Sequence, residues 1–144
     1  MNINQLKGKI NSWCKKNHID LCLLFGSFAS AKHHANSDID IALYSSKIDL
    51  LPHKLHLIGE LEPITGGFLD LVILYRDMDP LLRFEILTKG IPLFIAKKSI
   101  YIEQQIYAIK LNEDVSFLKR WQALSIDMKL ERLKHGTANS KTKN

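Results

Sequence analysis

Asp38 and Asp40 have one residue between them and lie at the start of an apolar run in which Ile39, Ile41 and Leu43 alternate with other residues. This two-residue period predicts a β-strand with one apolar face. Carboxylates two positions apart on a strand point to the same side, with their α-carbons roughly 6–7 Å apart. Two acids directed at one point repel each other unless a cation lies between them. Mg²⁺, held by carboxylates and substrate phosphates together, is the usual cation.

A second apolar run, residues 21–25, precedes the acids and ends at Gly26 and Ser27. It predicts a short buried strand followed by a turn, with Ser27 at the start of a helix. A glycine at the end of a strand lets a phosphate approach the backbone, and the amides of the following helix start point toward the anion. We therefore expect Gly26 and Ser27 to bind the phosphates of a nucleotide.

A third acid, Asp70, lies inside the run FLDLVILY at residues 68–75, which is dense in β-forming residues. A lone carboxylate in such a strand is costly to bury unless it is paired or binds a metal. Three carboxylates suffice for two divalent ions, which clamp the attacking and leaving oxygens of an in-line phosphoryl transfer. We expect Asp38, Asp40 and Asp70 to hold Mg²⁺, and Asp70 also to accept the proton of the attacking hydroxyl.

The Gly-Ser pair, ten intervening residues, the Asp-Ile-Asp triplet and the later Asp70 resemble one known family in their order and spacing. This family is the nucleotidyltransferases of the DNA polymerase beta type. The chain is most similar to the minimal single-domain branch, the MNT antitoxins that are paired with HEPN ribonuclease toxins. Residues 80–94 look like the helix–strand unit that follows the third aspartate in that branch. The resemblance covers about residues 21–96.

The resemblance implies a specific activity and set of ligands. MNT antitoxins carry magnesium on the three aspartates, bind ATP through the Gly-Ser turn and transfer AMP to a tyrosine hydroxyl of the partner toxin, which blocks its ribonuclease activity. Carried over, Asp38 and Asp40 are metal ligands, Asp70 is a ligand and base, and Gly26 and Ser27 hold the terminal phosphates of ATP. The implied partner is a HEPN toxin in a hetero-oligomer, with no requirement for nucleic acid.

The sequence departs from the family pattern at one place. After Gly-Ser-x-Ala the family usually has Arg-Gly, whereas this chain has Ser30 and Ala31, followed by Lys32. The missing arginine removes a bidentate donor near the nucleotide, and the missing glycine constrains the turn. Lys32 offers a point charge instead. The departure predicts weakened or altered nucleotide binding.

We expect an α/β nucleotidyltransferase fold, a short mixed β-sheet flanked by helices, with a C-terminal helical extension. The predicted domains are residues 1–98 for the minimal nucleotidyltransferase, 99–135 for the extension and 136–144 for a disordered tail. In the extension, one apolar stripe precedes a break at residues 112–114 and a second stripe follows it. The second stripe is expected to pack within the chain, although it is also the best candidate for a partner interface; its members are Phe117, Trp121, Leu124 and Met128.

Helix-capping residues and the periodicity of apolar residues predict the remaining helices and strands. Asn4 is predicted to cap a helix whose apolar stripe is Leu6, Ile10 and Trp13. Residues 49–61 predict a helix that is ended by residues 63–67, with an apolar side at Leu51, Leu55, Ile58 and Leu61. Asp79 and Pro80 predict a helix start, Gly90 its end, and residues 91–96 an edge strand because they include Pro92. Arg83 and Glu85 are expected to form a surface ion pair, with contact of Arg83 to a nucleotide or a partner as the alternative. His33 and His34 are expected to face solvent, with metal or phosphate binding as the alternative.

The composition of the 144 residues is that of an ordinary globular chain, with 46% hydrophobic and 24% charged residues. The net charge of +5 leaves nucleotide phosphates or nucleic acid open as partners. Cys14 and Cys22 lack metal-ligand spacing, so we expect two buried, reduced thiols. No segment has the apolar length of a membrane span or the start of a signal peptide, which predicts a cytoplasmic protein.

Two alternatives to the predicted antitoxin enzyme stay open. One is nucleotidyl transfer to a small molecule or to RNA, although such enzymes usually add an acceptor-binding domain and only about fifty residues follow the last predicted strand. The other is a non-catalytic antitoxin that neutralises its toxin by masking it, which the Ser30-Ala31 departure makes conceivable.

Overall fold

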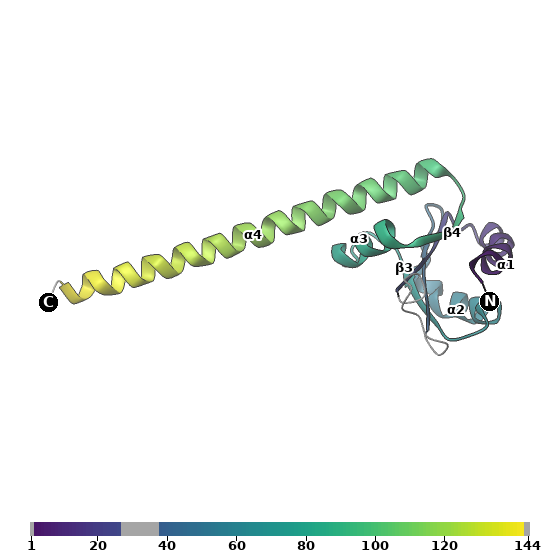
Figure 1. Cartoon of the computed structure of the whole chain (residues 1–144), viewed down its shortest axis with the longest axis horizontal. Coiled ribbons are helices and arrows are strands. Elements are labelled where there is room, and N and C mark those ends of the chain that lie inside the picture. The colour runs from purple at the N-terminus through teal and green to yellow at the C-terminus, as the bar shows by residue number, and fades with distance from the viewer. Residues whose placement is uncertain (1, 27–37, 143–144) are drawn as a thin grey trace. The chain divides into compact units, whose positions relative to one another are not determined.

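The fold was described from a computed structural model, in which residues 2–26 and 38–142 are placed, with side chains through residue 135. Its centre is a four-stranded mixed sheet of order β3-β2-β1-β4 (Figure 1). The strand β1 pairs antiparallel with β2 and with β4, and β2 pairs parallel with β3. The sheet and its flanking helices confirm the expected α/β nucleotidyltransferase fold. The bounds of the strands are Leu21–Phe25 for β1, Ile39–Tyr44 for β2, Leu69–Ile73 for β3 and Ile91–Ile95 for β4.

The first helix, α1, spans Ile3–Lys16 and begins two residues earlier than predicted. Asn2, and not Asn4, is the cap: its side chain accepts a hydrogen bond from the Gln5 amide at 2.8 Å, and the Gln5 side chain accepts one from the Asn2 amide. Gln at the third helical position completes this reciprocal capping box, which Asn4 lacks. The predicted apolar stripe of α1 is confirmed as buried.

The second helix, α2, spans Lys54–Thr65 and follows a single 3₁₀ turn, η2, at Leu51–His53. The predicted apolar side is confirmed at Leu61, which is fully buried, and Ile58 packs against the core. It was wrong at Leu55, which is 86% exposed, and Leu57 is buried instead. A 3₁₀ turn has three residues per turn, so its side chains do not stay in phase with the α-helix that follows. The helix continues past Pro63 to Thr65 and stops at Gly66, whose φ is 74°, within the predicted ending segment 63–67.

The third helix, α3, spans Pro80–Lys89 and matches the prediction at both ends. The Asp79 side chain caps it by accepting a hydrogen bond from the Leu81 amide at 3.2 Å. Gly90 ends it where backbone comes very close: a β-carbon there would overlap the Ile86 carbonyl oxygen and lie 3.3 Å from that of Leu24. The strand β4 lies at the edge of the sheet, as its Pro92 predicted.

The sheet has a different hydrophobic core on each face. Side chains at Ile39, Ile41 and Leu43 belong to the core formed with α1 and α2. The alternate residues Ala42 and Tyr44 belong to the core formed with α3 and the beginning of α4. Since side chains alternate along a strand, Asp40 lies on the same face as Ala42 and Tyr44. Both cysteines are buried and unpaired, as expected, and the hydrogen bond with Cys14, together with burial, raises the pKa of the Cys22 thiol.

The last helix, α4, is a single helix over Lys98–Thr142, so the break predicted at residues 112–114 was wrong. Helix propagation needs no new nucleus, and polar residues such as these continue a helix at little cost. The helix also includes residues 136–142, and the disordered tail expected over residues 136–144 stays a prediction. The chain divides into two compact units, Met1–Ile109 and Lys110–Asn144. Ala108 is fully buried in the core of the first unit, so the opening turns of α4 belong with the sheet domain.

In the second unit, the side chains of the predicted second stripe are exposed, and Trp121 retains 58% of its surface in solvent. The expectation that this stripe packs within the chain was therefore wrong for the described residues. Among the placed residues no helix is both long enough and apolar enough to cross a membrane.

Candidate active site

Asp40 and Asp70 lie directly opposite each other on the adjacent parallel strands β2 and β3. Neighbouring strands are roughly 4.8 Å apart, so the two side chains leave the same face of the sheet as immediate neighbours. Gly26 follows β1, whose last residue, Phe25, is the register partner of Asp40. Asp38 immediately precedes β2. The end of β1 and the starts of β2 and β3 therefore gather four of the five predicted site residues at one end of the sheet.

The carboxyl group of Asp40 carries an electrostatic cost at this end of the sheet. Burial is the largest cause that raises the pKa of Asp40, and the neighbouring charge of Asp70 is the next. A hydrogen bond with the Asp70 carboxyl and the charge of Asp38 act in the same direction. Both Asp38 and Asp70 are exposed, whereas Asp40 is partly buried. The like charges nearby therefore raise the cost of ionising Asp40, and a bound cation would remove that cost.

Gly26 is in close contact with this acid pair. Its φ is +73°, in the left-handed region that residues other than glycine rarely adopt. A β-carbon on residue 26 would overlap the Oδ2 atom of Asp40 and lie 2.8 Å from its Cγ. The position therefore requires glycine for two reasons, its backbone angle and the space that the carboxylate of Asp40 occupies.

The other predicted phosphate-binding residue, Ser27, lies outside the described residues, as do Ser30, Ala31 and the histidines that follow them. Within residues 2–26 and 38–142, no three His, Cys, Asp or Glu side chains are grouped so as to hold a metal ion. The structure thus places Asp40 next to Asp70, with Asp38 at the same end of the sheet. The three side chains do not form a complete group of three metal ligands. The donors are carboxylate oxygens, the ligands that Mg²⁺ prefers, and their mutual repulsion fits a divalent cation. The roles of all five residues stay predictions.

Asp20 is a buried acid that the sequence reasoning did not single out. Its side chain accepts hydrogen bonds from the Ser46 amide at 2.6 Å and from the Ser46 hydroxyl at 2.7 Å. These bonds tie the loop after β2 to the start of β1. The sequence indicates such a residue by placing a charge directly before a fully apolar strand. The role of Asp20 in this structure is to hold the two segments together.

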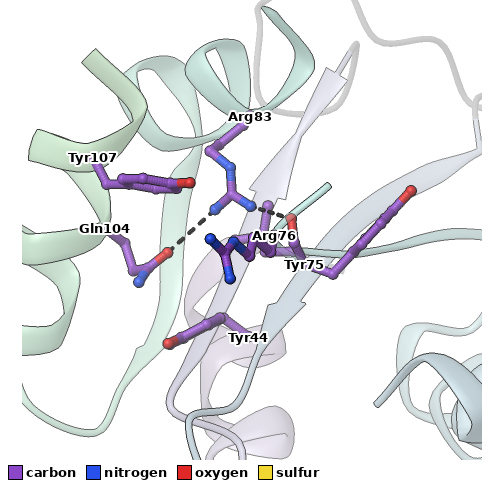
Figure 2. A pocket seen from close by; sticks show the side chains of 7 residues that line it. Tyr44, Tyr75, Arg76, Arg83, Gln104 and Tyr107 are labelled. Atoms are coloured by element: carbon purple, nitrogen blue, oxygen red, sulfur yellow. Dashed lines mark hydrogen bonds between the residues drawn. The ribbon is translucent and has the colours of Figure 1, made fainter. Parts of the chain in front are cut away.

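Arg83 is a second buried polar residue, and the surface ion pair predicted for it was wrong. Its side chain is 2% exposed, while Glu85 instead pairs with Lys89 at 3.1 Å. Glu85 and Lys89 are one helical turn apart and both lie on the exposed side of α3, whereas Arg83 faces inward. Arg83 lines a cavity of about 430 Å³, shown in Figure 2, together with Tyr44, Leu74, Tyr75, Arg76, Gln104 and Tyr107.

Known proteins resemble this chain in sequence and in fold. Residues 8–99 match the family described as polymerase beta nucleotidyltransferases. A protein of Methanocaldococcus jannaschii described as a candidate protein adenylyltransferase is 34% identical over 91 residues, which are 63% of this chain and 97% of that protein.

Two solved structures share most of the fold. A chain in the crystal structure of a toxin–antitoxin with AMP-PNP has 25% identity and a TM-score of 0.69, over 85% of this chain and 97% of the other. A chain in a structure of tri-AMPylated Shewanella oneidensis HEPN toxin with MNT antitoxin has 22% identity and a TM-score of 0.67, over 88% and 98%. The likeness at 22% identity concerns the fold alone. The match over residues 8–99 and the relative covered almost completely show that this chain belongs to the polymerase beta nucleotidyltransferase family and is a nucleotidyltransferase.

Proposed function

We propose that this nucleotidyltransferase transfers AMP from ATP to a hydroxyl group of a partner protein, a tyrosine of a HEPN ribonuclease toxin, and so acts as an antitoxin. The observation that carries the proposal is the direct pairing of Asp40 with Asp70 beside Gly26 at one end of the sheet. The relative described as a protein adenylyltransferase supports protein as the acceptor. The toxin–antitoxin structure with AMP-PNP supports an adenine nucleotide as the donor and a toxin as the partner.

The chemistry assigned to the residues is an in-line displacement at the α-phosphorus of ATP. The acceptor oxygen forms a bond to that phosphorus, the bond to the bridging oxygen of the β-phosphate breaks, and pyrophosphate leaves. Asp70, the more exposed member of the pair, accepts the proton of the attacking hydroxyl. Gly26 and Ser27 hold the terminal phosphates through backbone amides and a hydroxyl.

Mg²⁺, most simply two ions held by Asp38, Asp40 and Asp70, would neutralise the phosphate charge that the reaction redistributes. The raised pKa of Asp40 supports a cation at this position, since without one the carboxylates repel each other. A bound cation would keep the carboxylate of Asp40 ionised and oriented. The acids would then serve both nucleotide binding and the chemical step.

A protein acceptor is supported by the relative described as a protein adenylyltransferase, which this chain matches over 97% of that protein's length. The toxin–antitoxin structure with AMP-PNP supports a partner chain as the source of that acceptor. We infer a hetero-oligomer with the toxin, in which no nucleic acid is needed for transfer.

The test is the intact mass of the partner after co-expression of this chain with the product of the adjacent gene. The wild-type chain is expected to add one or more AMP units to the partner, and Asp40→Asn with Asp70→Asn to add none. Asp77→Asn, an exposed acid in the turn before α3, is the matched control and should leave the modification unchanged.

Each alternative has its own outcome in this experiment. If the acid variants still neutralise the toxin in an intact complex, the chain is a masking antitoxin and the enzymatic proposal is wrong. If labelled ATP marks RNA or a small molecule while the partner keeps its mass, the proposed acceptor is wrong.

A further inference from the structure

The cavity beside Arg83 is separate from the acid pair. Tyr44 is the last residue of β2, and Leu74 and Arg76 closely follow β3. Asp40 lies four positions earlier on β2, which at roughly 3.3 Å per residue places it about 13 Å from Tyr44 along the strand. The cavity and the acids therefore occupy opposite ends of the same face of the sheet.

The guanidinium of Arg83 is buried in the wall of this cavity without a counterion. It donates hydrogen bonds to the backbone carbonyl of Tyr75 and, at 3.3 Å, to the side-chain oxygen of Gln104. Its central carbon lies 5.2 Å from the centre of the Tyr107 ring. The Nε atom is buried and has no hydrogen-bond partner, and none of the described carboxylates pairs with the group. Buried cations are normally paired, so this one lacks an anion.

A second cation stands beside it. Figure 2 shows the side chains of Arg76 and Arg83 pointing into the space between Tyr44, Gln104 and Tyr107. Arg76 is exposed and makes no hydrogen bond or ion pair with the described residues. Two guanidinium groups side by side repel each other, and their planar donors match the oxygens of a phosphate group.

The remaining walls of the cavity are aromatic and apolar. The rings of Tyr44 and Tyr107 border the two guanidinium groups, whereas the ring of Tyr75 points away from them (Figure 2). The volume of about 430 Å³ lies within the roughly 300–1,000 Å³ of small-molecule sites and leaves room for more than a phosphate group. An aromatic wall next to two neighbouring cations suits a ligand in which a flat ring is attached to an anion.

We propose that this cavity binds a nucleoside monophosphate, with its phosphate on Arg76 and Arg83 and its base against Tyr44. This site is distinct from the nucleotide-binding end of the sheet at Gly26 and the acids. The proposal does not depend on AMP transfer, because the ligand is held by residues that take no part in the proposed chemistry. Binding would supply the anion that the buried guanidinium of Arg83 lacks.

The test is calorimetric titration of the full chain with AMP in the absence of divalent cations. Arg76→Gln is expected to weaken binding by about tenfold or more, since it removes one charged hydrogen-bonding partner at an exposed position. Arg83→Lys keeps the buried charge but loses the planar fork, and a similar loss is expected. Arg120→Gln, an exposed arginine of the second unit, is the matched control and should bind as the wild type does.

Inorganic phosphate separates the two parts of the ligand. We expect it to bind more weakly than AMP, and Tyr44→Leu to weaken AMP binding without changing phosphate binding. AMP binding also raises the melting temperature if the site is built, since only the folded chain presents it. If Arg76→Gln and Arg83→Lys both bind AMP with wild-type affinity, the proposed site is wrong. If phosphate and AMP bind with equal affinity, the proposed contact with the nucleoside is wrong. Arg76→Gln keeps the test valid even if Arg83→Lys fails to fold.

Discussion

Replacing Gly26 by alanine tests whether the geometry at the acid pair governs both stability and transfer. The left-handed φ of +73° costs a residue with a β-carbon about 1–2 kcal/mol. The new β-carbon would also lie 2.8 Å from Cγ of Asp40, and ordinary contacts begin at 3.4 Å. The carboxylate must therefore move by at least 0.6 Å, the difference between 3.4 and 2.8 Å.

A displacement of that size at a reacting group is expected to lower kcat/KM by roughly 10- to 100-fold, because a misplacement of about 1 Å costs on the order of 100-fold. The free energy of unfolding should fall by about 1–2 kcal/mol in urea titrations. The rate is measured as AMP incorporation into the partner protein by mass spectrometry. Gly67→Ala is the matched control, since a β-carbon there meets nothing within 4 Å. Wild-type transfer by a stably folded Gly26→Ala chain would refute the role of the acid pair.

Three further substitutions test the fold. Gly90→Ala should lower the free energy of unfolding by about 1–3 kcal/mol in urea titrations, because its β-carbon would overlap the Ile86 carbonyl oxygen in a packed backbone. Asp20→Ala should cost about 3–6 kcal/mol, since it removes two hydrogen bonds of roughly 1.5–3 kcal/mol each from the Ser46 amide and hydroxyl to a charged acceptor. Trp121→Ala should change the stability by no more than about 0.5 kcal/mol by the same measurement, because its side chain is 58% exposed.

Each of these predictions has an outcome that contradicts it. Gly59→Ala, in the open interior of α2, should stabilise the chain by up to about 1 kcal/mol, so an equal effect at Gly90 would contradict the close packing there. A loss at Asp20 no larger than at the exposed Asp77 would contradict its structural role. A loss of about 3–5 kcal/mol at Trp121 would indicate a buried side chain.

Local chemistry predicted some elements almost residue by residue. The strand β1 and the helix α3 fall where the apolar run, the Asp79 cap and the terminal Gly90 placed them. These signals act within a few residues of the chain, so no tertiary contact is needed to interpret them. Prediction failed at Leu55, because the side of α2 that faces the core depends on the 3₁₀ turn before the helix. It also failed in α4, where a predicted break at polar residues is instead a continuous helix.

The sequence by itself determined the types of residue at the acid end of the sheet, because a strand period and a glycine turn are local patterns. Only the tertiary structure decided that Asp40 lies opposite Asp70, since their proximity depends on the register of two strands that are 24 residues apart between Tyr44 and Leu69. It also decided that Arg83 is buried beside Tyr44 of β2 and Tyr107 of α4. Side chains distant in sequence meet only when the sheet and helices pack, and packing is the step that no local period encodes.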